Sequence, residues 1–402
     1  MSLKRNRTVE LYSIALVLLL ISNICFYTAE TPQLYRLMSG SGILLSFVVS
    51  LRRFSMVIKK SNCILWLSAV YAMFMFYGHF FLREGTFPWT SMITRYLENI
   101  ALYVAIKGIF REDYRKLAPS FISAGFFSLL YLIAREGALI ALGGYRIGGS
   151  LSGNVNTAGF CFGIVSSVVI WSYCMKRDRK KLILFLVLLV FMILTGSKKV
   201  TIVIMADLFL ILAYRKDKIT TWILLAIGLT AGAYCLFNVP YLYEIMGVRI
   251  ESMFLTLLYG NNASLYSYST EARGEMVQEA FRLFLHHPIF GGGYNYFFAM
   301  TVTRYDYCHC NYAELLCSFG VVGTMLYYSK HLSVLGRLTR ALKRRTGNRD
   351  LAVFGVILLL MILTLDWGAV TFSAQATWYL PVLISNAASD TIQANLSRNG
   401  GR

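Results

Sequence analysis

Charged residues are scarce in this sequence. They make up 15% of the 402 residues, whereas hydrophobic residues make up 57%. Soluble globular domains contain about 45–50% apolar residues, so this composition argues against a soluble protein. Uncharged runs recur along the chain, each about long enough to cross a hydrocarbon core of ~30 Å. The sequence therefore predicts an all-α polytopic membrane protein.

Metal-type cysteine spacing is lacking as well. The chain has eight cysteines, but none forms a C-x-x-C pair, and most lie inside apolar runs, where a free cysteine behaves as a small hydrophobe. Cys308 and Cys310 flank His309, but a zinc site needs further ligands. We expect no metal and no other cofactor.

The apolar runs predict about twelve transmembrane helices and one large outer loop, periplasmic or extracellular, that contains amphipathic helices. Residues 1–237 hold nine spans, residues 238–309 form the outer loop, and residues 310–402 hold three spans and a cytoplasmic tail. The expected spans are 11–29, 34–50, 62–82, 91–108, 118–140, 157–175, 182–195, 200–214, 219–237, 310–329, 351–366 and 370–387.

Acidic residues are about half as numerous as basic ones, which leaves a net charge of +19. A basic balance often indicates nucleic acid, but here the positions of the charges decide otherwise. With a cytoplasmic N-terminus, clusters such as 176–181 and 330–349 fall in cytoplasmic loops, as the positive-inside rule requires. We therefore expect no nucleic-acid partner and a cytoplasmic location for both termini.

Some basic residues depart from this rule. Lys198 and Lys199 lie between two spans of about 15 apolar residues, and each span reaches only about 22 Å. Lysines below the outer surface favour a cavity filled by water or anions. The alternative is local thinning of the membrane, with both side chains reaching the interface.

A polar loop, RIGGSLSGNVNTAG (146–159), precedes the sixth span and opens with Arg146. Asn154 and Asn156 offer amide groups of the kind that bind sugar hydroxyls. The alternative is a flexible polar loop in which an asparagine caps the next helix.

Residues 269–293 predict an amphipathic helix that lies along the outer membrane face and ends at Pro288 and three glycines. Arg273 in its first turn opposes the helix dipole, which favours a bound anion beside it. The alternative is an ion pair between Arg273 and a nearby acid.

The stretch HCNYAELLCSFGVVG (309–323) places His309, Asn311 and Glu314 at the start of an apolar helix. Polar groups within one helical turn share a face. A histidine, with a reference pKa near ~6.5, can accept a proton from a hydroxyl. The alternative is a capped helix start with a buried histidine.

These motifs, in their order and spacing, resemble the O-antigen polymerase and O-antigen ligase superfamily of membrane glycosyltransferases. SGNVNTAG (152–159) is similar to the Gly-Asn-x-Asn element of that family, and LTGSKKV (194–200) to its Thr-Gly-Ser-Arg element, with Lys198 where arginine is usual. The further matching residues are Arg273, Pro288, Gly291, Gly293, His309, Asn311, Tyr312, Glu314, Leu315, Gly320 and Gly323.

The resemblance implies a bacterial inner-membrane enzyme whose outward-facing site acts on an oligosaccharide carried by undecaprenyl pyrophosphate. It implies His309 as the base, with Glu314 orienting it or acting in its place, and Arg273 as a catalytic cation. It also implies a flippase and a chain-length regulator as partners. Further substrate-binding residues would be Arg146, Asn154, Asn156, Lys198, Lys199, Arg282, Asn311 and Tyr312.

Three functions remain open at this stage. We favour a polysaccharide polymerase that makes O-antigen, capsule or exopolysaccharide. A ligase that transfers finished polymer to lipid A core would use similar motifs. A flippase or other transporter is the third, although transporters often show internal repeats and the two halves of this sequence show none.

Overall fold

The computed structural model describes most of the chain, and the described residues are helical almost throughout, with no strand among them. They form two compact units, one of Met1–Leu19, Ser39–Leu117 and Glu271–Arg402, the other of Leu20–Met38 and Ala118–Thr270. The described stretches are 2–28, 30–51, 61–83, 85–142, 146–151, 154–215, 219–259, 268–301, 306–343, 348–373 and 375–399.

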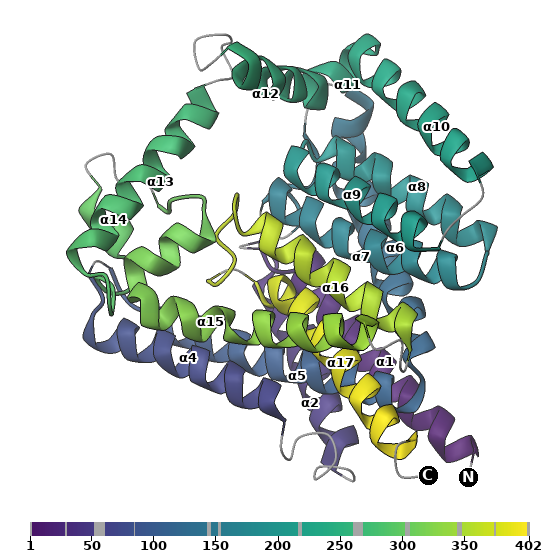
Figure 1. The fold of residues 1–402 in the computed structure, drawn as a ribbon, viewed down its shortest axis with the longest axis horizontal. Coiled ribbons are helices and arrows are strands. Elements are labelled where there is room, and N and C mark those ends of the chain that lie inside the picture. Colours follow the sequence, from purple (N-terminus) through teal and green to yellow (C-terminus); the bar gives the residue numbers. More distant parts are fainter. Residues whose placement is uncertain are drawn as a thin grey trace. The chain divides into compact units, whose positions relative to one another are not determined.

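The first unit is built around the long helix α15, which lies along α4 and α16 (Figure 1). Helix α17 packs on both α5 and α16. Its helices are the first part of α1 (Ser2–Cys25), most of α2 (Pro32–Leu51), α4 (Asn62–Phe80), α5 (Trp89–Asp113), η1 (Tyr114–Lys116), most of α13 (Tyr268–His286), α14 (Tyr296–Met300), α15 (Asn311–Lys343), α16 (Arg349–Leu365), η4 (Ala376–Tyr379) and α17 (Leu380–Asn399).

The second unit is built around α7, which is buried along nearly its whole length and packs on α8 and α9. Its principal helices are α6 (Leu117–Leu142), α7 (Val155–Met175), α8 (Arg179–Leu194), α9 (Lys198–Arg215), α10 (Ile219–Asn238), α11 (Pro240–Leu242), η2 (Tyr243–Gly247) and α12 (Val248–Tyr259).

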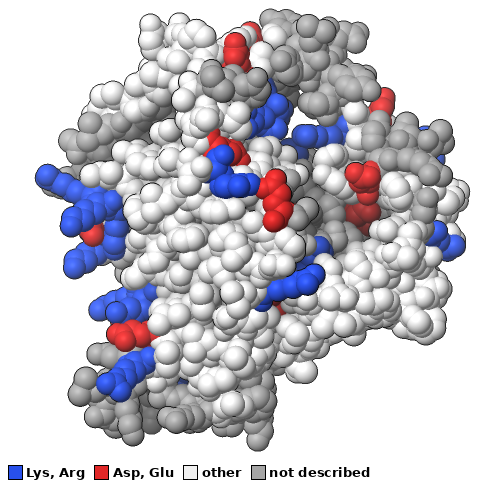
Figure 2. Space-filling model, turned by 180° about the vertical axis from the view of Figure 1, so that it is seen from behind, with Lys and Arg blue, Asp and Glu red and all other residues white. Residues whose placement is uncertain are grey.

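Five helical segments within the described residues are long and apolar enough to cross a membrane. One of them, Trp89–Ala141, covers two of the expected spans. Helices α8 and α16 have 16 and 17 residues, whereas a span usually needs about 20. Figure 2 shows wide areas of surface without charged side chains. The helical membrane character is confirmed, while the twelve spans, the outer loop and the cytoplasmic termini stay predictions.

The expected helix over 370–387 is wrong at its start, because regular α-helix begins only at Leu380. The amide groups of Thr371 and Phe372 donate to the side-chain oxygen of Asn311 at 2.9 and 3.0 Å. These bonds hold the segment as a loop against the start of α15. Helix α17 then continues to Asn399, beyond the expected span.

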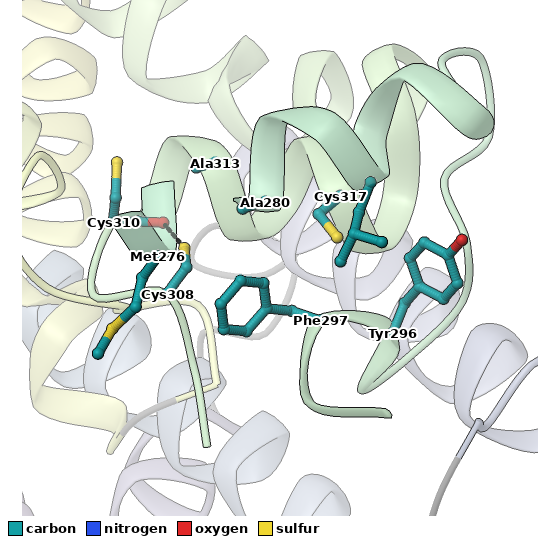
Figure 3. Close-up of a cluster of buried hydrophobic side chains, with 9 residues drawn as sticks. Met276, Ala280, Tyr296, Phe297, Cys308, Cys310, Ala313 and Cys317 are labelled. Carbon is teal, nitrogen blue, oxygen red and sulfur yellow. Dashed lines mark hydrogen bonds between the residues drawn. The ribbon is translucent and has the colours of Figure 1, made fainter. Parts of the chain in front are cut away.

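The expected amphipathic helix is confirmed as α13. Its buried side chains Met276, Ala280 and Leu283 pack on α14, the loop before α15 and the first turns of α15. Figure 3 shows this cluster around Phe297. Phe281 and Leu285 are exposed, so α13 has a second apolar surface that faces away from the unit.

Candidate functional site

Helix α15 is broken at Gly320, which adopts φ 64° and ψ −168°. A residue with this backbone conformation interrupts the helical hydrogen bonds around it. Without the break, the amides of Val321 and Val322 would bond to the carbonyls of Cys317 and Ser318. The break leaves all four groups in need of other partners.

The loop 287–293 supplies those partners. Gly291 adopts φ 76°, and a Cβ there would collide with the backbone of Ser318. The loop is also fixed to α4, since the Tyr77 hydroxyl donates to the Phe290 carbonyl at 2.7 Å. The four replacement bonds run from the amides of Gly292, Gly293, Val321 and Val322 to the carbonyls of Cys317, Ser318, Pro288 and Ile289, at 2.9, 3.0, 2.9 and 3.1 Å respectively.

His309 lies in the short loop that enters α15. Its φ is 59°, which is uncommon for a residue other than glycine and costs on the order of 1–3 kcal/mol. The buried Glu314 carboxylate accepts a hydrogen bond from the Cys308 amide at 2.9 Å. The Cys308 thiol in turn donates to the Cys310 carbonyl at 3.0 Å, drawn in Figure 3. These contacts hold the loop in the shape that presents His309.

Tyr307 links His309 to Arg273. The rings of Tyr307 and His309 have centroids 4.3 Å apart. Burial raises the pKa of Tyr307, and the positive charge of Arg273 opposes that rise. Arg273 therefore lies within electrostatic range of a tyrosine whose ring contacts His309, although Arg273 and His309 are far apart in the sequence.

Arg282 does not join this group. It follows Arg273 by nine residues in α13, which turns it to the opposite side of the helix. Its side chain is 73% exposed and pairs with Glu279 at 3.0 Å. The two arginines therefore cannot hold the same small anion.

Asn311 and Tyr312 make their polar contacts within the protein. The Asn311 amide nitrogen donates to the Tyr328 hydroxyl at 2.9 Å and to the Asp366 carboxylate at 3.3 Å. With the two amides that bond to its oxygen, all four bonds available to an asparagine side chain are made. The Tyr312 hydroxyl donates to the Leu363 carbonyl at 2.7 Å. Asn311 therefore positions the start of α15 against the loop after α16.

In the second unit, Arg146 joins the two earlier motifs. Its Nε donates to the Thr195 carbonyl at 2.7 Å, and a terminal nitrogen donates to the Asn156 side chain at 2.9 Å. Asn154 caps α7, since its side chain accepts from the Asn156 amide at 2.8 Å. The helix cap, which was the alternative to a sugar-binding role, is confirmed, and substrate binding by Asn154 stays a prediction.

Two helix N-termini meet at this arginine. Gly159, in the second turn of α7, lies so close to Thr195 and Ser197 that an added Cβ would be 2.8 and 2.9 Å from their side chains. Lys198 and Lys199 begin α9, where positive side chains oppose the helix dipole. An anion at this place would be stabilised by Arg146, both lysines and the N-terminus of α9.

The sequence reasoning missed Glu136, which shapes this loop. It is buried, and its carboxylate accepts from the amides of Gly148 at 2.6 Å and Ser150 at 2.5 Å. It thus fixes the backbone that follows Arg146. A lone acid inside an apolar run was the available signal, because such residues usually mark a functional or tightly bonded position.

Residues 182–328 match a known family, Wzy_C, described as O-Antigen ligase. We call this matched stretch the Wzy_C domain. The match confirms the resemblance to the O-antigen polymerase and ligase superfamily. The Wzy_C domain contains both lysines, Arg273 and His309, whereas Arg146 precedes it. No curated protein matches the chain.

Within the Wzy_C domain, we expect Asn311→Ala to destabilise the protein by about 2–4 kcal/mol, because it leaves two buried amides and the Asp366 carboxylate short of partners. Thermal unfolding of the purified protein in detergent measures this change. Tyr312→Phe, which removes one hydroxyl bond, is the matched control and should cost about 1 kcal/mol. Equal unfolding temperatures for Asn311→Ala and the wild type would contradict the positioning role.

Upstream of the Wzy_C domain, we expect Glu136→Ala to release the loop after Arg146, since two backbone amides lose their acceptor at about 1–3 kcal/mol each. Tryptic cleavage after Arg146 should become faster. Glu30→Ala is the control, because Glu30 forms an exposed pair with Arg135 worth about 0–1 kcal/mol. An unchanged cleavage rate in Glu136→Ala would show that the two hydrogen bonds of Glu136 do not hold this loop in place.

Proposed function

We propose that this protein is a polysaccharide polymerase of the inner membrane. It transfers an oligosaccharide from undecaprenyl pyrophosphate to a sugar hydroxyl of another lipid-linked repeat unit. The observation that carries the proposal is the His309 loop, held in a left-handed conformation by buried Glu314 inside a Wzy_C domain. A costly backbone conformation maintained by a dedicated carboxylate favours a functional role for the side chain it presents.

In the proposed reaction, His309 accepts the proton of the acceptor hydroxyl as its oxygen attacks the anomeric carbon of the donor. The bond between that carbon and the pyrophosphate oxygen breaks, and the pyrophosphate leaves on its carrier lipid. His309 suits this role better than Glu314, because Glu314 is 6% exposed and already accepts the Cys308 amide. Glu314 is therefore a positioning residue in this proposal.

The negative charge that develops on the pyrophosphate needs cations. Arg273 is the candidate near His309. Arg146, Lys198 and Lys199 stay predicted substrate ligands within the second unit. Positively charged donors aimed at developing charge lower a barrier most when they are fixed beforehand. Arg146 meets this condition through its bonds to Thr195 and Asn156.

We expect Arg273→Ala to lower the transfer rate by about 10²–10³-fold, as the loss of one charge-stabilising group does in other enzymes. Arg282→Ala on the same helix is the matched control and should stay near the wild-type rate, because Arg282 is exposed and paired with Glu279. The assay is transfer by purified enzyme in liposomes. Equal losses in the two variants would mean that general positive charge, and not the position of Arg273, matters.

A ligase is the second candidate, since the matched family is described by that activity. Electrophoresis of surface glycan from a strain without this gene separates the two. Single repeats on the normal acceptor, with the ladder lost, would mean polymerase. Long polymer left on the lipid carrier would mean ligase. An unchanged glycan profile would overturn both, and lipid-linked repeats trapped inside the cell would mean the transporter alternative.

A further inference from the structure

A second polar cluster lies in the first unit, where the last turns of α15 lie beside the middle of α17 and near α5. The Arg337 guanidinium donates to the Asn386 side chain at 2.9 Å and lies 3.5 Å from the Asp390 carboxylate. Lys107 also lies 3.5 Å from Asp390. The cluster belongs to no motif of the Wzy_C domain, which ends at residue 328.

Positive charge exceeds negative charge in this cluster. Lys107 and Arg337 share the single carboxylate of Asp390. Lys330 is buried and interacts electrostatically with all three of these residues. Among the described residues of this cluster, three cations therefore share one acid, and a further anion would be stabilised beside them.

A pocket of about 160 Å³ opens next to this cluster. Its polar lining comes from Arg337, Arg340, Ser389 and Gln393, and its apolar lining includes Leu338 and Ile392. A cavity of this volume holds a group larger than a water molecule. The lining joins two guanidinium groups to an apolar wall, which is the pattern expected for an anionic group with an apolar part attached.

Two buried polar atoms of residues that line the pocket lack a hydrogen-bond partner among the described residues. They are the Ser389 hydroxyl and the Arg337 Nε. Ser389 is only 2% exposed. Buried polar groups without partners are costly and rare in native proteins, so an unpaired hydroxyl and an unpaired guanidinium nitrogen in one pocket indicate a missing acceptor.

We propose that this pocket binds one phosphate-bearing anion. Its oxygens accept hydrogen bonds from Arg337 Nε, Ser389 and the Arg340 guanidinium, and any apolar chain it carries lies against Leu338 and Ile392. Phosphate fits because its several oxygens accept from several donors at once and because guanidinium binds it strongly. The ligand is the headgroup of an anionic phospholipid or free phosphate, and it is separate from the proposed glycan substrate.

Native mass spectrometry of the full chain in a nonionic detergent tests the proposal. The probes are phosphatidylglycerol, the zwitterionic phosphatidylethanolamine as comparison, and inorganic phosphate. We expect the wild type to retain one phosphatidylglycerol, and Arg340→Gln and Ser389→Leu to bind it about tenfold more weakly, as the loss of one charge-assisted bond predicts. Lys343→Gln is the matched control, since Lys343 is an exposed cation at the end of the same helix outside the pocket lining.

Each outcome decides the question. Weaker phosphatidylglycerol binding in Arg340→Gln but not in Lys343→Gln supports a lipid headgroup site. A free phosphate site is supported if inorganic phosphate binds the wild type, binds Arg340→Gln more weakly, and phosphatidylglycerol does not bind. Equal losses in Arg340→Gln and Lys343→Gln would show diffuse surface attraction and overturn the proposal, as would the binding of neither probe. Arg340 is exposed, so its variant remains informative if Ser389→Leu does not fold.

Discussion

Replacing His309 with asparagine should lower the rate of glycan transfer by about 10²–10⁴-fold, the usual contribution of a positioned general base. Asparagine is the sharpest substitution, because it tolerates the left-handed backbone at this position better than most residues. The fold should therefore survive while the proton acceptor is lost. His309→Ala removes the same base but adds a backbone cost.

The measurement is single-turnover transfer by the purified protein in liposomes, with unfolding temperature measured in parallel. His286→Asn is the matched control, because His286 is exposed at the end of α13 and outside the loop that enters α15. It should transfer at the wild-type rate. A wild-type transfer rate in His309→Asn would show that His309 is not the base, for a polymerase and for a ligase alike.

Gly320→Ala should have the largest effect on stability. A Cβ at this position would collide with the Ile289 carbonyl, and φ is 64°. A backbone with φ 64° and ψ −168° is adopted essentially by glycine alone and costs an alanine about 1–3 kcal/mol. Overpacking typically adds about 1–3 kcal/mol. We expect much less protein in the membrane fraction and a clearly lower unfolding temperature in detergent.

Gly336→Ala provides the comparison within the same helix. A Cβ at Gly336 would meet nothing within 4 Å, so alanine there should be neutral or stabilising by up to ~1 kcal/mol. If both alanine variants unfold like the wild type, the replacement bonds between the loop 287–293 and α15 contribute nothing measurable.

Much of the helical architecture could be predicted from the sequence, because apolar runs and helix-ending residues are local signals. The amphipathic helix α13 is an example, with its apolar spacing and the proline and glycines that follow. The start of α17 could not be predicted. It depends on bonds from Thr371 and Phe372 to Asn311, some 60 residues away in the chain.

The site residues show the same limit. The residue types of His309 and Glu314 made them candidates. They could not predict that Glu314 accepts a hydrogen bond from the Cys308 amide or that the His309 backbone has a positive φ. Asn311 was predicted to bind substrate, because its protein partners lie in distant segments of the chain and could not be identified from the sequence. Arg282 was predicted to bind the substrate together with Arg273, but the nine-residue spacing between them places the two side chains on opposite sides of α13.

The exchange of hydrogen bonds at Gly320 also bears on how the protein is made. In lipid, each unpaired backbone group costs several kcal/mol, so a broken helix cannot remain there alone. Residues 310–329 are a predicted span, and the loop 287–293 belongs to the predicted outer loop and is synthesised before α15. On this prediction the loop must be translocated before residues 317–322 enter the membrane. We therefore expect an ordered biogenesis of this segment, in which delayed translocation of the loop leaves α15 exposed to quality-control proteases.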